Sequence, residues 1–280
     1  MLQRTLGYLA MLFVVLLIGL PLFWMLSGSL KTTQEIYSTD TQWIPESPLW
    51  SNYRDAWERA PFGRFYINST IVTLLGAGLE IVNATLTAYA LAYLRFPFKN
   101  LVFILILAAL MIPPQVTILP NYVFFGLNGV IGELFGESWI NTYQAIILPG
   151  ASVAFGTFMM RQAFLGLPRE VLDAAKVDGA GHLRILRDVV LPMAKPVIVT
   201  FALISLVAKW NDYLWPLVIT QTQNMRVLTI GISYLFDAEG NNEWGIIMAA
   251  TFFVVFPLLI VFLFAQRFII EGLTAGATKG

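Results

Sequence analysis

Long apolar stretches are the feature of this sequence that most limits the folds open to it. A helix needs about 20 apolar residues to cross the hydrocarbon core of a lipid bilayer. Stretches of this kind occupy residues 6–26, 68–94, 101–120, 141–160, 197–219 and 244–265 of the 280-residue chain. The sequence therefore predicts an all-α polytopic membrane protein with six transmembrane helices.

The composition excludes the main soluble classes. Hydrophobic residues make up 58% of the chain and charged residues 12%, whereas a soluble domain carries about 25% charge. A chain this apolar could not cover a soluble surface, and disorder requires the opposite composition. The 17 basic and 17 acidic residues balance, so no basic field points to nucleic acid. With no cysteine and one histidine, His182, the chain has no disulfide, thiolate metal site or multi-histidine metal site.

The first apolar stretch has an alternative interpretation as a signal peptide. It is longer than the roughly 7–15 residues of a signal-peptide core, and no small-residue cleavage pattern follows it. We therefore expect a retained helix.

The distribution of basic residues predicts the orientation. With a cytoplasmic N-terminus, the inner segments hold 11 Lys and Arg residues and the outer segments hold 5, as the positive-inside rule requires. Both termini are thus predicted on the cytoplasmic side of a cell membrane. No internal repeat is evident, so we expect one membrane domain over residues 1–280. It comprises an N-terminal span, an outer loop at 27–67, core spans over 68–265 with an inner loop at 161–196, and a cytoplasmic tail at 266–280.

The inner loop at 161–196 is the most charged segment. Pro168 suits the first turn of a helix, and Asp178 with Gly179 indicates a turn. A second helix is expected after this turn, ended by Pro192 and Pro196, with an apolar stripe of Leu183, Leu186 and Val190. The pattern predicts a helix–turn–helix docking element with small residues at its bend. The alternative is an amphipathic helix lying on the lipid surface.

Polar residues inside the spans are candidates for a translocation path, because polar groups are costly there. Lys209 and Asp212 are spaced i,i+3 and could neutralise one another. Aromatic neighbours such as Tyr213 add aromatic surface beside these polar groups. The alternative is that these residues hold helices together. The candidates for the path are Glu80, Asn83, Trp210, Asn211, Asp212 and Trp215.

One motif in the inner loop resembles a known family. The segment 173–180, Asp-Ala-Ala-Lys-Val-Asp-Gly-Ala, followed by Leu191 and Pro192, is similar to the EAA loop of bacterial ATP-binding-cassette (ABC) importer permeases, with Asp173 in place of the usual Glu. Segments 95–100, 111–116, 141–143 and 210–216 resemble the carbohydrate branch of that family. The tail at 266–280 is similar to that of its maltose-permease-like (MalG-like) subunits.

The resemblance implies a type I ABC importer permease fold and a set of contact residues. In such importers the EAA loop forms a coupling helix that sits in a cleft of a separate ATPase subunit. The implied coupling residues are Glu170, Asp173, Ala174, Ala175, Asp178, Gly179, Ala180, Leu191 and Pro192. The tail residues implied to reach the ATPase subunits are Glu271, Gly272, Leu273, Thr274, Ala275 and Gly276.

The partners are implied in the same way. They are a second homologous permease subunit, two ATPase subunits, an extracytoplasmic sugar-binding protein and the lipid bilayer. The chain has no Gly-x-x-x-x-Gly-Lys-Ser/Thr phosphate loop, so it is not itself the ATPase. We therefore expect no enzymatic activity and no cofactor in this chain, with ATP and Mg²⁺ bound by the partner subunits.

The predicted function is that of the permease subunit of a sugar importer of the inner membrane, moving a disaccharide, oligosaccharide or related polyol by ATP-driven alternating access. The same importer class carrying glycerol phosphate or another solute is one alternative. An ion-coupled secondary transporter is a second, although only Glu80 and Asp212 fit the buried acids that this class favours. A receptor or scaffold without transport is a third.

Overall fold

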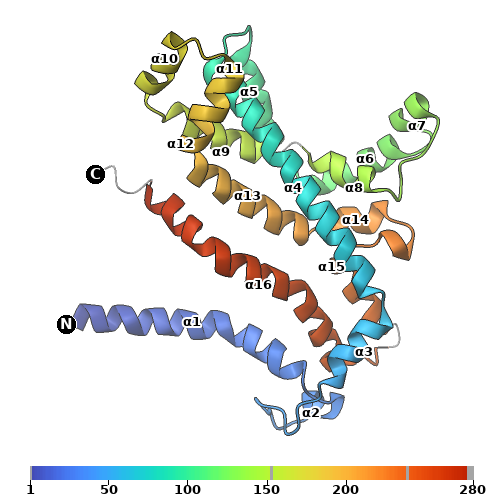
Figure 1. The fold of residues 1–280 in the computed structure, drawn as a ribbon. Coiled ribbons are helices and arrows are strands. Elements are labelled where there is room, and N and C mark those ends of the chain that lie inside the picture. The colour runs from blue at the N-terminus through green and yellow to red at the C-terminus, as the bar shows by residue number, and fades with distance from the viewer. Residues whose placement is uncertain (1, 152–153, 238–239, 276–280) are drawn as a thin grey trace. The chain divides into compact units, whose positions relative to one another are not determined.

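The computed structural model describes residues 2–151, 154–237 and 240–275, with side chains over 4–266. Every regular element in these ranges is helical (Figure 1). The contacts divide the chain into two compact units. Unit 1 comprises Met1–Tyr66 and Leu228–Ile260, and unit 2 comprises Ile67–Val227 and Val261–Gly280. The long helices α4 (Phe62–Tyr93) and α16 (Trp244–Ala275) contribute residues to both units.

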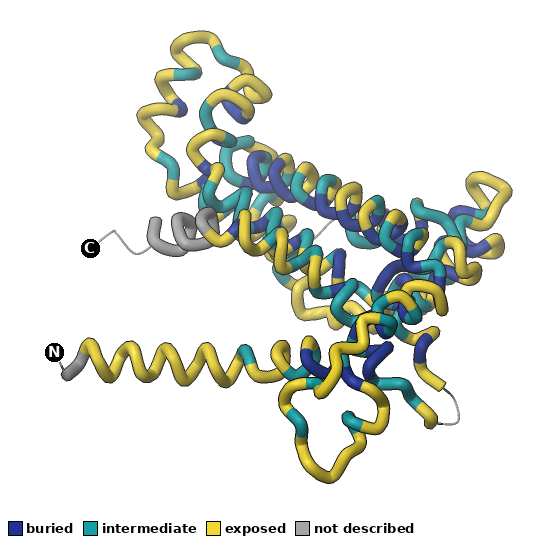
Figure 2. Tube along the Cα trace, turned by 60° about the horizontal axis from the view of Figure 1, so that its bottom comes forward, coloured by how far each residue is buried: buried dark blue, intermediate teal, exposed yellow. Residues whose placement is uncertain are grey.

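Unit 1 contains the first span and the predicted outer loop. Helix α1 (Leu2–Gly28) contains a span candidate, Arg4–Gly28, whose apolar window is 0% buried, and Figure 2 shows exposed residues along most of its length. The loop forms two short helices, α2 (Thr33–Tyr37) and α3 (Ser51–Arg59). The unit is completed by α15 (Leu228–Gly231), η5 (Ile232–Leu235) and the first part of α16.

A buried lysine organises the outer loop. Lys31 is only 1% exposed; its ammonium donates to the carbonyl oxygen of Gln42 and lies 4.3 Å from the ring centroid of Trp24. The amide nitrogen of Asn52 donates to the carbonyl oxygens of Ser29 and Lys31, at 3.0 and 2.9 Å. Burial lowers the pKa of Lys31. These bonds supply the partners that buried polar groups require, and they join the end of α1 to α3.

Unit 2 contains the remaining helices. They are α5 (Lys99–Ala109), η1 (Pro114–Thr117), α6 (Ile118–Phe125), α7 (Val130–Phe135), α8 (Tyr143–Ile147), η2 (Leu148–Gly150), α9 (Ala154–Leu165), α10 (Arg169–Val177), α11 (His182–Ile185), the π-helical η3 (Leu186–Val190), α12 (Leu191–Met193), α13 (Lys195–Trp210), α14 (Leu214–Ile219) and η4 (Gln223–Met225). Its core joins α4, α9 and α10–α13 through Ala84, Ala88, Tyr89, Met160, Phe164, Leu172, Ile185, Leu186, Val190, Ala194 and Phe201.

The helices confirm the all-α polytopic class. Among the described residues, four candidate spans are long and apolar enough to cross a membrane, and there are up to six if each of two bent helix pairs counts as one. The predicted spans at 6–26, 68–94 and 244–265 correspond to α1, α4 and α16. The span predicted at 141–160 corresponds to α8, η2 and α9.

Two predicted spans differ in their bounds. The span at 101–120 is interrupted, because α5 ends at Ala109 and Pro113 precedes Pro114; a residue before proline disfavours the helical conformation. The segment after this break, Pro114–Phe135, is a candidate span of its own. The span at 197–219 is also interrupted, since α13 ends at Trp210 and α14 begins at Leu214.

Candidate functional site

The predicted docking element is formed by α10, α11, η3 and α12. Helix α10 buries Leu172 and exposes Val177 at 88%. It ends in a tight turn in which Gly179 has φ +75° and its N–H donates to the carbonyl oxygen of Lys176 at 3.0 Å. Glycine adopts this left-handed conformation without steric cost. The predicted turn at Asp178 and Gly179 is therefore confirmed.

The structure separates the residues implied in docking into two groups. Ala175, Ala180 and Leu191 pack partly buried against the core of unit 2. The other members are exposed, and they are Glu170, Asp173, Ala174, Asp178, Gly179 and Pro192. The exposed group is free to meet another molecule, whereas the packed group attaches the element to the helices behind it.

The second helix of the element differs from the prediction. Leu183 was expected on the apolar stripe but is 78% exposed, and Ile185 is buried instead. The helix continues through the π-helical segment η3, whose wider turn changes the face that each residue presents. The helical segment His182–Met193 ends between the two prolines, as predicted: Pro192 lies in its last turn, and Pro196 lies in the first turn of α13. The segments His182–Met193 and Lys195–Trp210 meet at a bend of 82°.

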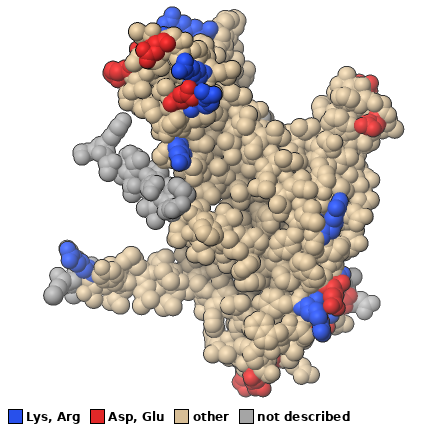
Figure 3. All heavy atoms as spheres, in the orientation of Figure 1, with Lys and Arg blue, Asp and Glu red and all other residues tan. Residues whose placement is uncertain are grey.

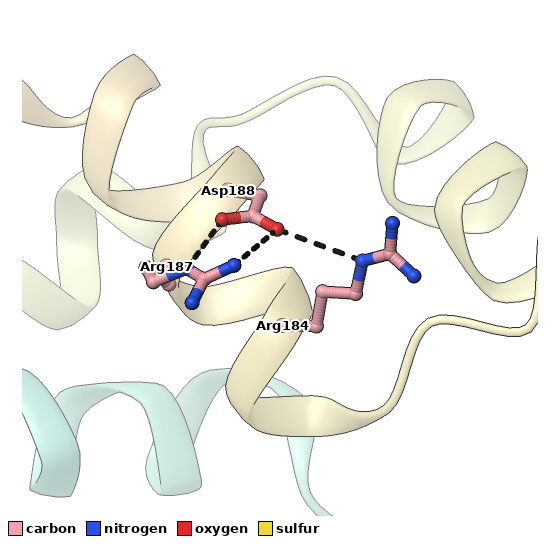
Figure 4. Close-up of polar contacts among 3 residues, drawn as sticks. All are labelled: Arg184, Arg187 and Asp188. Atoms are coloured by element: carbon pink, nitrogen blue, oxygen red, sulfur yellow. Dashed lines mark hydrogen bonds and ion pairs between the residues drawn. The ribbon is translucent and has the colours of Figure 1, made fainter.

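Exposed charges cover this element, as Figure 3 shows over α10 and α11. Asp173 accepts from the ammonium of Lys176 at 2.7 Å, and this bond holds its pKa below the usual range. Arg187 donates to both oxygens of Asp188, at 2.6 and 3.1 Å, and Nε of Arg184 lies 3.6 Å from the same carboxylate (Figure 4). The pKa of Asp188 is lowered, chiefly by the bond from Arg187. Exposed pairs of this kind add little stability, so these charges remain available to a partner.

The element is joined to the membrane helices of unit 2. The hydroxyl of Tyr89 on α4 lies 3.1 Å from Nδ1 of His182 at the start of α11. Leu172 and Ile185 share one apolar core with Phe164 of α9 and with residues of α4 and α13. A displacement of α10 therefore acts on packed side chains, which shift between discrete arrangements rather than stretching.

A second feature of unit 2 is a cavity of about 410 Å³. Three interruptions of helices line it: the start of η1 at Pro114, the segment η2 at Pro149 and Gly150, and the break at residues 211–213. Broken helices within membranes occur where protein or a water-filled cavity satisfies the backbone. The polar and aromatic lining residues are Gln115, Thr117, Asn121, Lys209, Asn211, Asp212, Tyr213 and Trp215.

An ion pair lies beside the cavity. Nζ of Lys209 is 3.1 Å from Oε1 of Glu80, and it donates to the carbonyl oxygen of Gly150 at 3.1 Å. Glu80 also accepts from the hydroxyl of Ser205. The sequence suggested that Lys209 and Asp212 could neutralise one another; the structure pairs Lys209 with Glu80 on a different helix and also keeps an electrostatic interaction between Lys209 and Asp212.

The predicted path residues lie in different surroundings. Asn211, Asp212 and Trp215 line the cavity, and Glu80 reaches it through Lys209. Asn83 is exposed on α4, where its oxygen accepts from the hydroxyl of Thr87 at 3.2 Å. Trp210 is buried at the end of α13. Sequence reasoning missed Gln115, Thr117 and Asn121, although the proline pair before them signalled a break.

Two asparagines fix the chain at the end of α14. Asn141 has φ +66°, and its Oδ1 accepts from the backbone nitrogens of Gln221 and Thr222 at 2.8 and 3.0 Å. The amide of Asn68 donates to the carbonyl oxygens of Asn224 and Arg226 at 2.8 and 2.7 Å. Trp215 donates to the carbonyl oxygens of α8 residues Ala145 and Ile146. Together these bonds hold the cavity wall formed by α14.

The predicted tail contact lies largely outside what the structure describes. The backbone of α16 continues to Ala275, but side chains beyond residue 266 and the whole of Gly276 lie outside the described residues. The proposed roles of Glu271, Gly272, Leu273, Thr274, Ala275 and Gly276 stay predictions.

The family follows from comparison with known proteins. Residues 81–274 match the model of the binding-protein-dependent transport system inner membrane component. The chain belongs to this family. It is 35% identical over 274 residues to the sn-glycerol-3-phosphate transport system permease protein UgpE of Pectobacterium atrosepticum, covering 95% of this chain and 92% of that protein. It is 31% identical to UgpE of Brucella abortus, covering 97% and 96%.

The fold of this family is confirmed by solved structures. A bacterial ABC transporter that imports the acidic polysaccharide alginate contains a chain matching with a TM-score of 0.80 at 20% identity, over 95% of this chain and 96% of that one. A second structure, of a bacterial alginate ABC transporter in complex with an alginate pentasaccharide-bound periplasmic protein, matches with a TM-score of 0.67 at 17% identity, over 95% and 94%. The chain is thus a multi-pass inner-membrane permease component with the fold of ABC importer permeases.

Proposed function

We propose that this permease moves a sugar or related polyol into the cell, driven by ATP hydrolysis in separate subunits that dock on α10 and α11. Both termini and the docking element would lie on the cytoplasmic side, as the distribution of basic residues favours. The complete importer would contain a second homologous permease, two ATPase subunits and an extracytoplasmic binding protein. A periplasmic protein is part of the complex in one structural neighbour.

The observation that carries the docking proposal is the division of α10 into two faces. Leu172 lies in the core shared with α4, α9 and α13, while Asp173 and Ala174, which follow it directly, are exposed. A surface of small and charged residues, backed by a core, can receive a partner and pass its motion to the membrane helices. An amphipathic helix resting on lipid would bury its apolar face in lipid, whereas the buried apolar residue of α10 packs against its own chain.

The test reconstitutes the chain with its partner permease, ATPase subunits and binding protein in lipid vesicles. Ala174→Trp adds bulk to the exposed face of α10, and Leu134→Trp on α7 is the matched control, because Leu134 is also exposed. Loss of about 2 kcal/mol from the contact would weaken docking about thirtyfold. We expect Ala174→Trp, and not the control, to weaken ATPase binding by about this factor and to lower ATP-dependent uptake.

Unchanged ATPase binding by Ala174→Trp would refute docking on α10. Uptake that continues without ATP and follows an imposed ion gradient would instead favour a secondary transporter. Capture of partner proteins without any uptake would favour a scaffold.

Glycerol phosphate is a second candidate cargo, because curated relatives at 31–35% identity are named for sn-glycerol-3-phosphate transport. Vesicle uptake of radiolabelled maltose and of sn-glycerol 3-phosphate, each with its own concentration series, separates the two candidates.

A further inference from the structure

Two cations meet at the end of α4. Nζ of Lys99, at the start of α5, donates to the carbonyl oxygens of Ala92 and Leu94 at 3.1 and 3.0 Å. Nε of Arg161, on α9, donates to the carbonyl oxygen of Leu91 at 3.4 Å. Both side chains thus bind the last turn of one helix, where the charge of Arg161 acts directly on Lys99.

The positive charge at this helix end exceeds what the chain itself neutralises. The carbonyl end of a helix carries about half an elementary negative charge, which is less than the two charges of Lys99 and Arg161. Within the described side chains, the ion pairs with carboxylates are all made by other basic residues. Both cations are half-buried, so water and salt screen their repulsion less than at an open surface. One further anion would therefore complement this group.

The guanidinium of Arg161 is held in place with donors to spare. Its Cζ lies 3.9 Å from the ring centroid of Phe103 on α5, and that ring stacks on Phe158 of α9 at 6.4 Å between centroids. Nε serves the carbonyl oxygen of Leu91, and among the described residues the two Nη groups have no protein acceptor. Guanidinium donors fixed in this way match the oxygens of a phosphate group.

Exposed apolar side chains adjoin the two cations. Phe98, next to Lys99, is 76% exposed and has φ +58°. Such a conformation is unusual for a bulky residue, and residues held in it cluster at functional sites. Phe96 is exposed as well. The exposed apolar residues that follow on α5 are Leu101, Ile104 and Leu105. A free phosphate ion makes no use of this apolar surface, whereas the acyl chains of a phospholipid do.

We propose that the turn between α4 and α5 binds an anionic phospholipid, with Lys99 and Arg161 on its phosphate and its acyl chains along α5. The turn joins the ends of two apolar helices, so it lies at the depth of the lipid headgroups. Anionic lipids attract basic residues at this depth. A protein partner seated on the charges of the turn would leave the apolar face of α5 uncovered. The lipid site is independent of the cargo of the permease.

The experiment uses phospholipids that carry a photoactivatable diazirine on one acyl chain. The complete importer is placed in phosphatidylcholine nanodiscs with a trace of labelled phosphatidylglycerol or labelled phosphatidylcholine, and cross-links on α5 are located by mass spectrometry. Lys99→Gln with Arg161→Gln removes both charges, whereas Lys99→Arg with Arg161→Lys keeps them while altering the bonds to α4. Arg54→Gln is the matched control, because Arg54 is exposed on α3 and lies 3.7 Å from Asp55.

We expect α5 to be labelled by phosphatidylglycerol in preference to phosphatidylcholine. Each cation removed should lower the phosphatidylglycerol labelling about fivefold. The charge-conserving pair and Arg54→Gln should retain it. Equal labelling by the two lipids overturns the proposal, since any lipid around the protein would then make the contact. An equal loss in the charge-conserving pair also overturns it, because altered structure rather than lost charge would explain the result.

Two further arms identify a different occupant. Inorganic phosphate in millimolar excess should leave the labelling unchanged, and suppression by it would assign the cations to a free anion. Labelling that appears only when the ATPase subunits are omitted would assign the turn to a protein contact. Either result overturns the proposal. ATP-dependent uptake is measured in parallel, and loss of uptake with labelling retained would contradict the proposed function alone.

Discussion

The ammonium of Lys209 on α13 lies 3.1 Å from a carboxylate oxygen of Glu80 on α4, so two helices of the unit 2 core are joined by a buried ion pair. Ser205, one turn before Lys209, donates a hydroxyl to the other oxygen of the same carboxylate. The carboxylate is thus satisfied entirely by one neighbouring helix. Such a pair fixes the register of the two helices, because its geometry is recovered in only one alignment.

Removing one partner of this ion pair should destabilise unit 2 more than removing both. Lys209→Met leaves the buried Glu80 carboxylate unpaired, and we expect it to lower the stability of unit 2 by about 3–5 kcal/mol. The double variant Lys209→Met with Glu80→Gln should recover most of this loss. Thermal unfolding of the detergent-solubilised protein measures both. Additive losses in the double variant would show that the two side chains do not interact.

The turn at Gly179 should be disturbed by a residue that disfavours the left-handed conformation. Gly179→Ala forces a side chain into a left-handed conformation at about 1–2 kcal/mol, which would displace the end of α10. We expect membrane insertion to be normal and substrate-stimulated ATP hydrolysis by the complete importer to fall severalfold. Gly181→Ala is the matched control, because Gly181 has φ −73° and open space around it. Equal activity of the two variants would remove the turn from the coupling mechanism.

The buried residue of α10 should determine how firmly the docking element is held. Leu172→Ala creates a cavity that we expect to cost about 2–5 kcal/mol. Val177→Ala, at an exposed position on the same helix, should have almost no effect. Cross-linking yield between α10 and the ATPase subunit, measured alongside uptake, separates the consequences. We expect Leu172→Ala to retain docking but to lose uptake, since the docked element would no longer move the core with it.

Binding of the ATPase subunits to the docking element should persist to lower pH because of Lys176. Its hydrogen bond lowers the pKa of Asp173, so the carboxylate stays charged to lower pH than an isolated aspartate. A group whose pKa is depressed makes its contribution above that pKa and loses it as the pH falls through it. Lys176→Ala should therefore shift the acid limit of ATPase binding to higher pH, whereas Lys176→Arg should keep it. A pH series of binding to immobilised ATPase subunits provides the measurement.

Local sequence signals predicted the elements that depend on neighbours along the chain. Apolar stretches located α1, α4 and α16, and Asp178 with Gly179 located the turn, because span length and turn conformation are set by adjacent residues. Pro113 and Pro114 indicate from the sequence a break in helical hydrogen bonding within the span at 101–120, and the structure has this break. The separate candidate span Pro114–Phe135 was not predicted, because apolar length was given more weight. Of the expected apolar stripe, Leu186 and Val190 are buried as predicted and Leu183 is exposed. Periodicity alone carries no sign of the π-helical turn of η3 that follows Leu183.

Contacts between distant segments could not be predicted from the sequence. Glu80 and Ser205 are 125 positions apart, so only the packing of α4 against α13 identifies the partner of Lys209. The cavity depends in the same way on three separate breaks that meet in space. Its polar residues Gln115 and Asn121 show no pattern along the chain that would distinguish them from residues at any helix end.

Gly150 limits the amino-acid substitutions that this protein can accept during evolution. A methyl group added there would collide with the ammonium of Lys209, while the glycine's own carbonyl oxygen holds that ammonium in place. Positions 150 and 209 are therefore interdependent: a larger residue at position 150 requires the end of the Lys209 side chain to move away or to be shortened. Because the carbonyl oxygen of Gly150 and the carboxylate of Glu80 hold that ammonium, such a substitution would disturb both of these contacts at once.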